Sequence, residues 1–141
     1  YELTGKPLSE LQNRDNTLKF PYPLLKFAIS PETRTEIHER VAQRYQIMME
    51  QGLLDEVKGL YKRGDLHLDL PSIRCVGYRQ LWLHLDGEWD LDMAVEKSIV
   101  ATRQLAKRQM TWLRSEEELE WLVSDDPKNL ERVIAAIGSK C

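Results

Sequence analysis

The stretch ATRQLAKRQMTWLR, residues 101–114, is expected to form the second half of the longest helix, which we place at about residues 91–114. The whole chain has a formal net charge of −3, yet this stretch contains no carboxylate and four cations: Arg103, Lys107, Arg108 and Arg114. At about 100° per residue, all of these except Arg108 fall on one face of the helix. An apolar side is expected to pack against the rest of the protein: Leu105, Trp112 and Leu113. The cationic face suits phosphate groups, or else it is a solvated surface.

Outside this helix, the pattern of apolar residues predicts a mainly helical α/β chain. LLKFAI, residues 24–29, ends at a Ser-Pro pair and is predicted to be a buried strand. Ser30 is expected to cap the next helix, with Pro31 at its first position, and Gly52 is expected to end it. The remaining expected elements are a short helix at 4–12, a loop at 13–19, helices at 53–63, 71–85 and 127–137, and a strand at 120–123. Because two isolated strands cannot form a stable sheet alone, they are expected to belong to a larger sheet.

Composition describes one domain, or part of one, in an ordinary soluble protein of 141 residues with 42% hydrophobic and 30% charged residues. No apolar run approaches the roughly 18 residues of a membrane span, so no membrane contact is expected. The cysteines, Cys75 and Cys141, match neither a disulfide framework nor a zinc pattern, which fits a reduced, cytoplasmic setting. The histidines lack ligand spacing, and no metal site is expected in this chain. The tryptophans are interpreted as core or interface anchors: Trp82, Trp89, Trp112 and Trp121.

Two long motifs resemble those of the bacterial tRNA dimethylallyltransferases, also called tRNA isopentenyltransferases: PSIRCVGYRQLW at residues 71–82 and ATRQLAKRQMTWLR at residues 101–114. LTGKPLSEL, residues 3–11, and GDLHLDL, residues 64–70, match as well. The resemblance implies the C-terminal, mainly helical portion of a P-loop nucleotide-kinase-like fold, with one or two strands of its parallel sheet. The phosphate-binding loop G-x-x-x-x-G-K-[ST] of that family is not found in this sequence.

Residues 1–141 are therefore expected to be the C-terminal portion of the transferase core domain. The phosphate-binding loop, the catalytic aspartate and the RNA-clamping insertion would lie outside them, so the chain alone is expected to be inactive. The resemblance implies transfer of a dimethylallyl group from dimethylallyl diphosphate to N6 of the adenosine 3′ of the anticodon. Mg²⁺, held mainly outside this chain, would assist the departure of diphosphate. The expected partners are the tRNA anticodon stem–loop and the prenyl diphosphate, and a cytoplasmic monomer is expected.

Arg44 is the candidate catalytic residue. It lies at the edge of an expected buried stripe: Ile37, Val41, Tyr45 and Met48. From the residues alone, Arg44 either extends to solvent and pairs with a carboxylate such as Glu39, or binds an anion. HERVAQRYQIMMEQG, residues 38–52, aligns with the family's helix whose arginine contacts the donor diphosphate. The resemblance therefore implies that Arg44 holds the diphosphate and stabilises its charge as it leaves.

RNA-binding residues are expected in both motifs. The first motif offers two cations, a glycine, an aromatic ring and a side-chain amide: Arg74, Gly77, Tyr78, Arg79 and Gln80. Gly77 is expected inside the helix, where it packs closely against a neighbouring helix or admits another group. The second motif offers the following candidates: Thr102, Arg103, Gln104, Lys107 and Arg108. By resemblance these residues wall a channel for a flipped base and hold RNA phosphates, and which cations instead form internal ion pairs stays open.

Two other functions remain open from the sequence. One is a helical RNA-binding module without catalysis, whose RNA binding would depend on salt and ignore prenyl diphosphate. The other is a prenyltransferase that modifies free adenine nucleotides and would prefer AMP to an anticodon stem–loop. The length of the cationic helix favours the larger RNA substrate.

Overall fold

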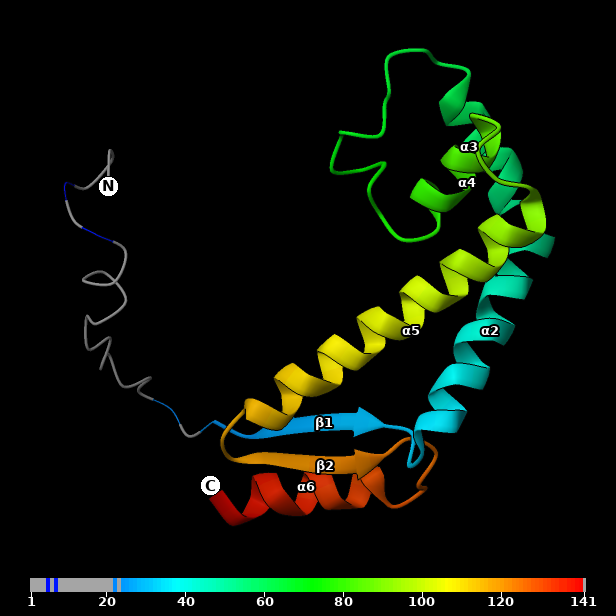
Figure 1. Ribbon diagram of the computed structural model, residues 1–141. Coiled ribbons are helices and arrows are strands. Elements are labelled where there is room, and N and C mark those ends of the chain that lie inside the picture. Colours follow the sequence, from blue (N-terminus) through cyan, green and yellow to red (C-terminus); the bar gives the residue numbers. More distant parts are fainter. Residues whose placement is uncertain (1–4, 6, 8–21, 23, 141) are drawn as a thin grey trace.

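The computed structural model of the protein describes residues 5, 7, 22 and 24–140 (Figure 1). The helix expected at 4–12 and the loop expected at 13–19 lie outside these residues, apart from Gly5 and Pro7. In the described part the strands are β1 (Lys26–Ser30) and β2 (Leu119–Val123). The helices are α2 (Arg34–Glu50), α3 (Leu53–Tyr61), α4 (Tyr78–Leu85), α5 (Leu91–Ser115) and α6 (Asn129–Lys140).

The two strands pair in parallel, from Lys26 opposite Leu119 to Ser30 opposite Val123. The chain between them forms α2 to α5, and Figure 1 shows the strands at one end of the molecule and α3 and α4 at the other. The long helices α2 and α5 connect these two ends. The prediction of a mainly helical chain with strands of a parallel sheet is thus confirmed.

A hydrophobic core holds the helical end together. Its buried side chains come from α2 to α5 and from the segment before α4: Tyr45, Leu53, Val57, Ile73, Leu81, Trp82 and Ala94. A buried hydrogen bond joins the two long helices, because the Tyr45 hydroxyl donates to Ser98 Oγ at 2.9 Å. Ser98 Oγ in turn donates to the carbonyl oxygen of Ala94 at 2.8 Å. Since an unpaired buried hydroxyl is costly, this chain of bonds fixes how α2 crosses α5.

The start of α2 differs from the prediction. Ser30 was expected to cap this helix, but it is the last residue of β1. Thr33 is the cap instead, because its hydroxyl oxygen accepts from the Glu36 N–H at 3.2 Å. A second hydroxyl three residues after Ser30 thus takes the capping position, and Pro31 belongs to the turn. The end of α2 just before Gly52, which has a φ of 97°, is as expected.

The helix expected from residue 71 begins only at Tyr78, so Gly77 is not inside a helix. Gly77 has a φ of 95° and ψ of −57°, which no helix contains and which favours glycine. Turns precede it, such as the bond from the Ile73 N–H to the Leu70 carbonyl oxygen at 3.0 Å. A β-carbon on Gly77 would lie 3.6 Å from the ring of Tyr45. Close packing against a neighbouring helix is therefore correct, and the neighbour is α2.

The apolar side expected for the second half of α5 is also wrong in part. Trp112 is 77% exposed and Leu105 is 39% exposed, whereas Leu113 is half-buried. The half-buried side of α5 here carries Ala106 and Met110, because β1 and α2 approach the helix from that direction. In the part of the chain that the structure describes, no helix is long and apolar enough to cross a membrane.

Candidate functional site

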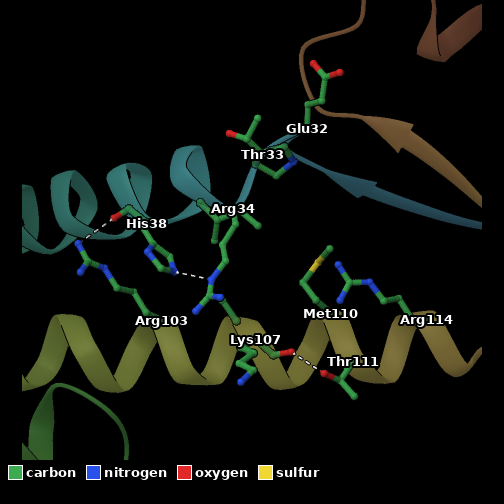
Figure 2. A pocket seen from close by; sticks show the side chains of 12 residues that line it. Glu32, Thr33, Arg34, His38, Arg103, Lys107, Met110, Thr111 and Arg114 are labelled. Atoms are coloured by element: carbon green, nitrogen blue, oxygen red, sulfur yellow. Dashed lines mark hydrogen bonds between the residues drawn. The ribbon is translucent and has the colours of Figure 1, made fainter.

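The start of α2 and the second half of α5 enclose a pocket of about 180 Å³ (Figure 2). Four of its lining side chains are cationic: Arg34, Arg103, Lys107 and Arg114. The prediction that the last three share one face of α5 is confirmed. Arg34 was missed, because a cation at the first residue of a helix gives no sign in the sequence of which other helix it faces. We call this hollow the cationic pocket.

His38 accepts hydrogen bonds from two of the arginines of the cationic pocket (Figure 2). Arg34 Nε donates to His38 Nε2 at 3.3 Å, and Arg103 Nη2 donates to the His38 carbonyl oxygen at 3.5 Å. Arg103 Nε is buried and has no hydrogen-bond partner among the residues that the structure describes. Across residues 24–140, none of the pocket's four cations forms an ion pair with a carboxylate. With four cations and one acidic side chain, Glu32, among its lining residues, the pocket therefore presents an excess of positive charge.

A second hollow of about 340 Å³ lies on the other side of Ile37, Ala106 and Met110, which line both hollows. We call it the Arg44 groove. Its walls are largely apolar and include the following: Ile29, Val41 and Leu113. Its two cations are Arg40 and Arg44.

The two arginines of the Arg44 groove differ in their partners. Arg40 pairs with Glu36 at 2.7 Å and with Asp125, and the hydrogen bond to Asp125 raises the pKa of the Arg40 guanidinium. Arg44 is exposed and forms no ion pair with any residue that the structure describes, so the alternative pairing with Glu39 is not found. Arg44 thus lies at the edge of the half-buried stripe, as predicted, and is free to bind an anion.

The residues expected from the first motif lie outside both hollows. Arg74 and Arg79 are exposed. The Tyr78 hydroxyl donates to the Glu56 carboxylate, and this bond raises the pKa of the phenol. Gln80 Oε1 accepts from the Gly77 N–H at 2.8 Å, so this amide oxygen supports the start of α4.

The candidate residues of the second motif lie on different faces of α5. Arg103 and Lys107 line the cationic pocket, whereas Gln104 and Arg108 are exposed and lie outside both hollows. The Thr102 hydroxyl donates to the carbonyl oxygen one turn earlier in α5, at Ser98, over 2.8 Å. The motif therefore supplies one face to a pocket and another to solvent.

A magnesium site is not formed by the described residues. They contain no group of three or more histidine, cysteine, aspartate or glutamate side chains that could hold a metal ion. Mg²⁺ prefers carboxylate and other oxygen ligands, and neither hollow offers more than one acidic side chain. No chemical step through Mg²⁺ is therefore assigned to this chain's residues.

Comparison with known proteins gives one family. The model of a family described as IPP transferase matches residues 1–116. The solved structure of a full-length tRNA isopentenylpyrophosphate transferase from Bacillus halodurans is 32% identical, with a TM-score of 0.77. The match covers 87% of this chain and 41% of that one.

A tRNA delta(2)-isopentenylpyrophosphate transferase from Staphylococcus epidermidis is 25% identical, with a TM-score of 0.74 over 99% of this chain and 45% of that one. The chain thus spans less than half the length of either solved relative. Both likenesses support a mainly helical fold with a small two-stranded parallel sheet.

Proposed function

Because the chain belongs to the IPP transferase family, we propose that it forms part of an enzyme that transfers a dimethylallyl group from its diphosphate to tRNA. Both solved relatives are named as tRNA isopentenylpyrophosphate transferases, which supports tRNA as the acceptor. The acceptor atom in this proposal is N6 of the adenosine just 3′ of the anticodon. A cytoplasmic monomer is part of the same proposal.

The observation that carries this proposal is the Arg44 groove. Its apolar walls suit the branched hydrocarbon of a dimethylallyl group, whose burial is favourable. Arg44, without an ion-pair partner in the described structure, offers a guanidinium that binds phosphate oxygens through two parallel hydrogen bonds. Apolar walls beside a free cation match the two chemical ends of a prenyl diphosphate.

In the proposed reaction, N6 of the adenosine forms a bond to C1 of the dimethylallyl group. The bond between C1 and the diphosphate oxygen breaks, and its electron pair leaves with the diphosphate. The N6 proton passes to a base, which the family resemblance assigns to an aspartate outside this chain. Arg44 stabilises the negative charge that grows on the leaving diphosphate. Any Mg²⁺ would be held mainly by residues outside this chain, where it would supply further charge neutralisation in the complete enzyme.

The RNA is proposed to contact the residues of both motifs: Arg74, Gly77, Tyr78, Arg79, Gln80, Thr102, Arg103, Gln104, Lys107 and Arg108. Five of these ten are exposed, and their side chains, four cations and one amide, have no hydrogen-bond or ion-pair partner in the described structure: Arg74, Arg79, Gln104, Lys107 and Arg108. Cations of this kind suit RNA phosphates, whose contacts position the RNA.

The experiment that tests this function incubates the complete enzyme with an anticodon stem–loop, dimethylallyl diphosphate and Mg²⁺, followed by mass spectrometry of the RNA. We expect the mass to rise by one dimethylallyl group, and fragmentation to place it on the adenosine 3′ of the anticodon. We expect no such rise with the 141-residue chain alone, because the proposed base lies elsewhere. An unmodified RNA from the complete enzyme, or modification of AMP in preference to the stem–loop, would contradict the proposal.

A further inference from the structure

We propose that Met110 determines the chain length of the prenyl donor, because it closes the Arg44 groove after a five-carbon chain and excludes a ten-carbon chain. The inference rests on the proposed function, since it takes the groove as the site of the prenyl diphosphate. It adds a residue that selects among donors by the length of their hydrocarbon. Three observations carry it: another apolar hollow beyond Met110, the contacts that hold Met110 between the two hollows, and the length of the groove.

The hollow beyond Met110 has a volume of about 290 Å³ and lies at the strands. We call it the Trp121 hollow. Its walls include Trp121 and Val123, which are 39% and 43% exposed and, two residues apart, lie on the same face of β2. Its charged lining residues, Glu32 and Arg114, have opposite signs. The Trp121 hollow thus offers exposed apolar surface against which further hydrocarbon can be buried.

Met110 separates the Arg44 groove from the Trp121 hollow, since Met110, Ser30 and Pro31 line both. Ser30 Oγ lies 3.6 Å from Met110 Sδ, the distance of a weak hydrogen bond to sulfur, and 3.1 Å from the Pro31 carbonyl oxygen. Ser30 and Pro31 belong to the end of β1 and the turn after it, whereas Met110 reaches them with its side chain from α5. Figure 2 shows this side chain extending away from α5, toward the start of α2. One flexible side chain therefore completes the wall.

The length of the hydrocarbon decides whether a donor reaches this wall. With the diphosphate held by Arg44, the chain lies along Val41 and then Ile37, which line the groove and are four residues, or about 6 Å, apart along α2. At about 1.5 Å for each carbon–carbon bond, the three bonds along a dimethylallyl chain span at most about 4.5 Å. The seven bonds along a geranyl chain span at most about 10 Å. The longer chain therefore extends beyond Ile37, where Met110 and Pro31 close the groove.

Shortening Met110 is expected to join the Arg44 groove to the Trp121 hollow. A geranyl chain would then bury its second isoprene unit against Trp121 and Val123, while the diphosphate remains at Arg44. The cationic pocket also adjoins Met110, but its excess of positive charge makes it the less favourable place for hydrocarbon. The reaction itself is unchanged: N6 forms a bond to C1 of the geranyl group, and the diphosphate leaves with the electron pair.

The test measures kcat/KM of the complete enzyme for dimethylallyl and geranyl diphosphate, with an anticodon stem–loop as acceptor and mass spectrometry of the RNA as readout. Met110→Ala opens the wall, and Met110→Leu keeps its bulk. Leu113→Ala is the matched control, because Leu113 is an apolar residue of α5 that lines the Arg44 groove but not the Trp121 hollow. Met110→Val shortens the side chain less, and it keeps the test decisive if Met110→Ala does not fold.

We expect the wild type to prefer dimethylallyl diphosphate by about 100-fold or more, and Met110→Ala to reduce this preference by about tenfold or more. Met110→Val should be intermediate. Met110→Leu should keep the preference of the wild type, because the volume of the side chain is conserved. Leu113→Ala should change kcat/KM for both donors alike and leave the preference unchanged.

Three results would overturn the proposal. The first is a wild type that uses both donors equally well. The second is a preference in Met110→Ala and Met110→Val equal to that of the wild type. The third is an equal gain of geranyl transfer in Leu113→Ala, because any enlargement of the groove would then suffice.

Failure of this inference is separate from failure of the proposed function. Isothermal titration calorimetry of the complete enzyme with each diphosphate, without RNA, measures donor binding in the absence of turnover. Met110→Ala is expected to bind geranyl diphosphate about tenfold or more tightly than the wild type does. This gain in an enzyme that does not prenylate RNA would refute only the function. Prenylation of RNA with an unchanged donor preference in Met110→Ala would refute only the inference.

Discussion

The buried hydrogen bond between α2 and α5 leads to different predictions for its two partners, Tyr45 and Ser98. Tyr45→Phe removes the bond to Ser98 Oγ, but Ser98 Oγ still donates to the Ala94 carbonyl oxygen, so no buried donor is left unsatisfied. The expected loss is about 1 kcal/mol, the net value of one neutral hydrogen bond. Ser98→Ala instead leaves the buried Tyr45 hydroxyl without its acceptor, which costs about 1–3 kcal/mol.

Urea unfolding followed by circular dichroism measures both free energies of unfolding, and a loss of 1 kcal/mol corresponds to roughly 3–5 °C in melting temperature for a chain of this size. The double variant should lose less than the sum of the two single losses, because the two residues contact each other. Tyr61→Phe is the control, since its hydroxyl donates to Asp86 at an exposed site and its loss should stay within about 0.5 kcal/mol. A Tyr45→Phe loss as large as that of Ser98→Ala, or strictly additive losses, would refute the reasoning.

Three further predictions concern other parts of the fold. Gly77→Ala should reduce the free energy of unfolding by about 1–2 kcal/mol, because φ is 95° at this position. Gly59 lies inside α3 with open space where a β-carbon would be, so Gly59→Ala should instead raise the free energy of unfolding by about 0.5–1 kcal/mol. Urea unfolding measures both changes. Burial raises the pKa of Tyr45, so its contribution to stability is full below the ordinary tyrosine pKa of about 10 and is lost as the pH rises through the higher folded value. Melting temperatures should therefore fall more steeply above about pH 10 in wild type than in Tyr45→Phe, and parallel curves would contradict this. Trp112→Ala should change the melting temperature of this chain by little, because the side chain is 77% exposed, and a loss typical of a core tryptophan would show that it is packed in solution.

The parts of the fold that the sequence predicts correctly are those with local signals. Gly52 ends α2 as expected, and α5 begins after a carboxylate of the kind that favours a helix start, since Asp90 accepts from the Met93 N–H at 2.7 Å. The buried strand expected at 24–29, from an apolar run closed by a Ser-Pro pair, is found at residues 26–30, although Ile29 is 64% exposed and the strand is thus buried only in part. Where two residues offer the same local signal, as Ser30 and Thr33 do for the cap of α2, the choice depends on where the strand ends in three dimensions.

The errors arise where tertiary contacts decide. Residues 71–77 have the composition of a helix start, but Gly77 packs under Tyr45 with a positive φ and delays the helix to Tyr78. The helical period gives the faces of α5 but not which face meets α2, so Trp112 was interpreted as an anchor although it is exposed. For the same reason the sequence places three cations on one face without revealing that Arg34 completes their pocket.

Steady-state kinetics of the complete enzyme, with the donor concentration varied, test the central claim that the Arg44 groove holds the prenyl diphosphate. The comparison is between Arg44→Ala and Lys62→Ala, which removes an exposed cation outside both hollows. We predict that Arg44→Ala lowers kcat/KM for dimethylallyl diphosphate by about 100-fold or more, the usual effect of losing one group that stabilises developing charge. Lys62→Ala should leave it unchanged. A kcat/KM in Arg44→Ala equal to that of Lys62→Ala would contradict the assignment of the groove to the donor.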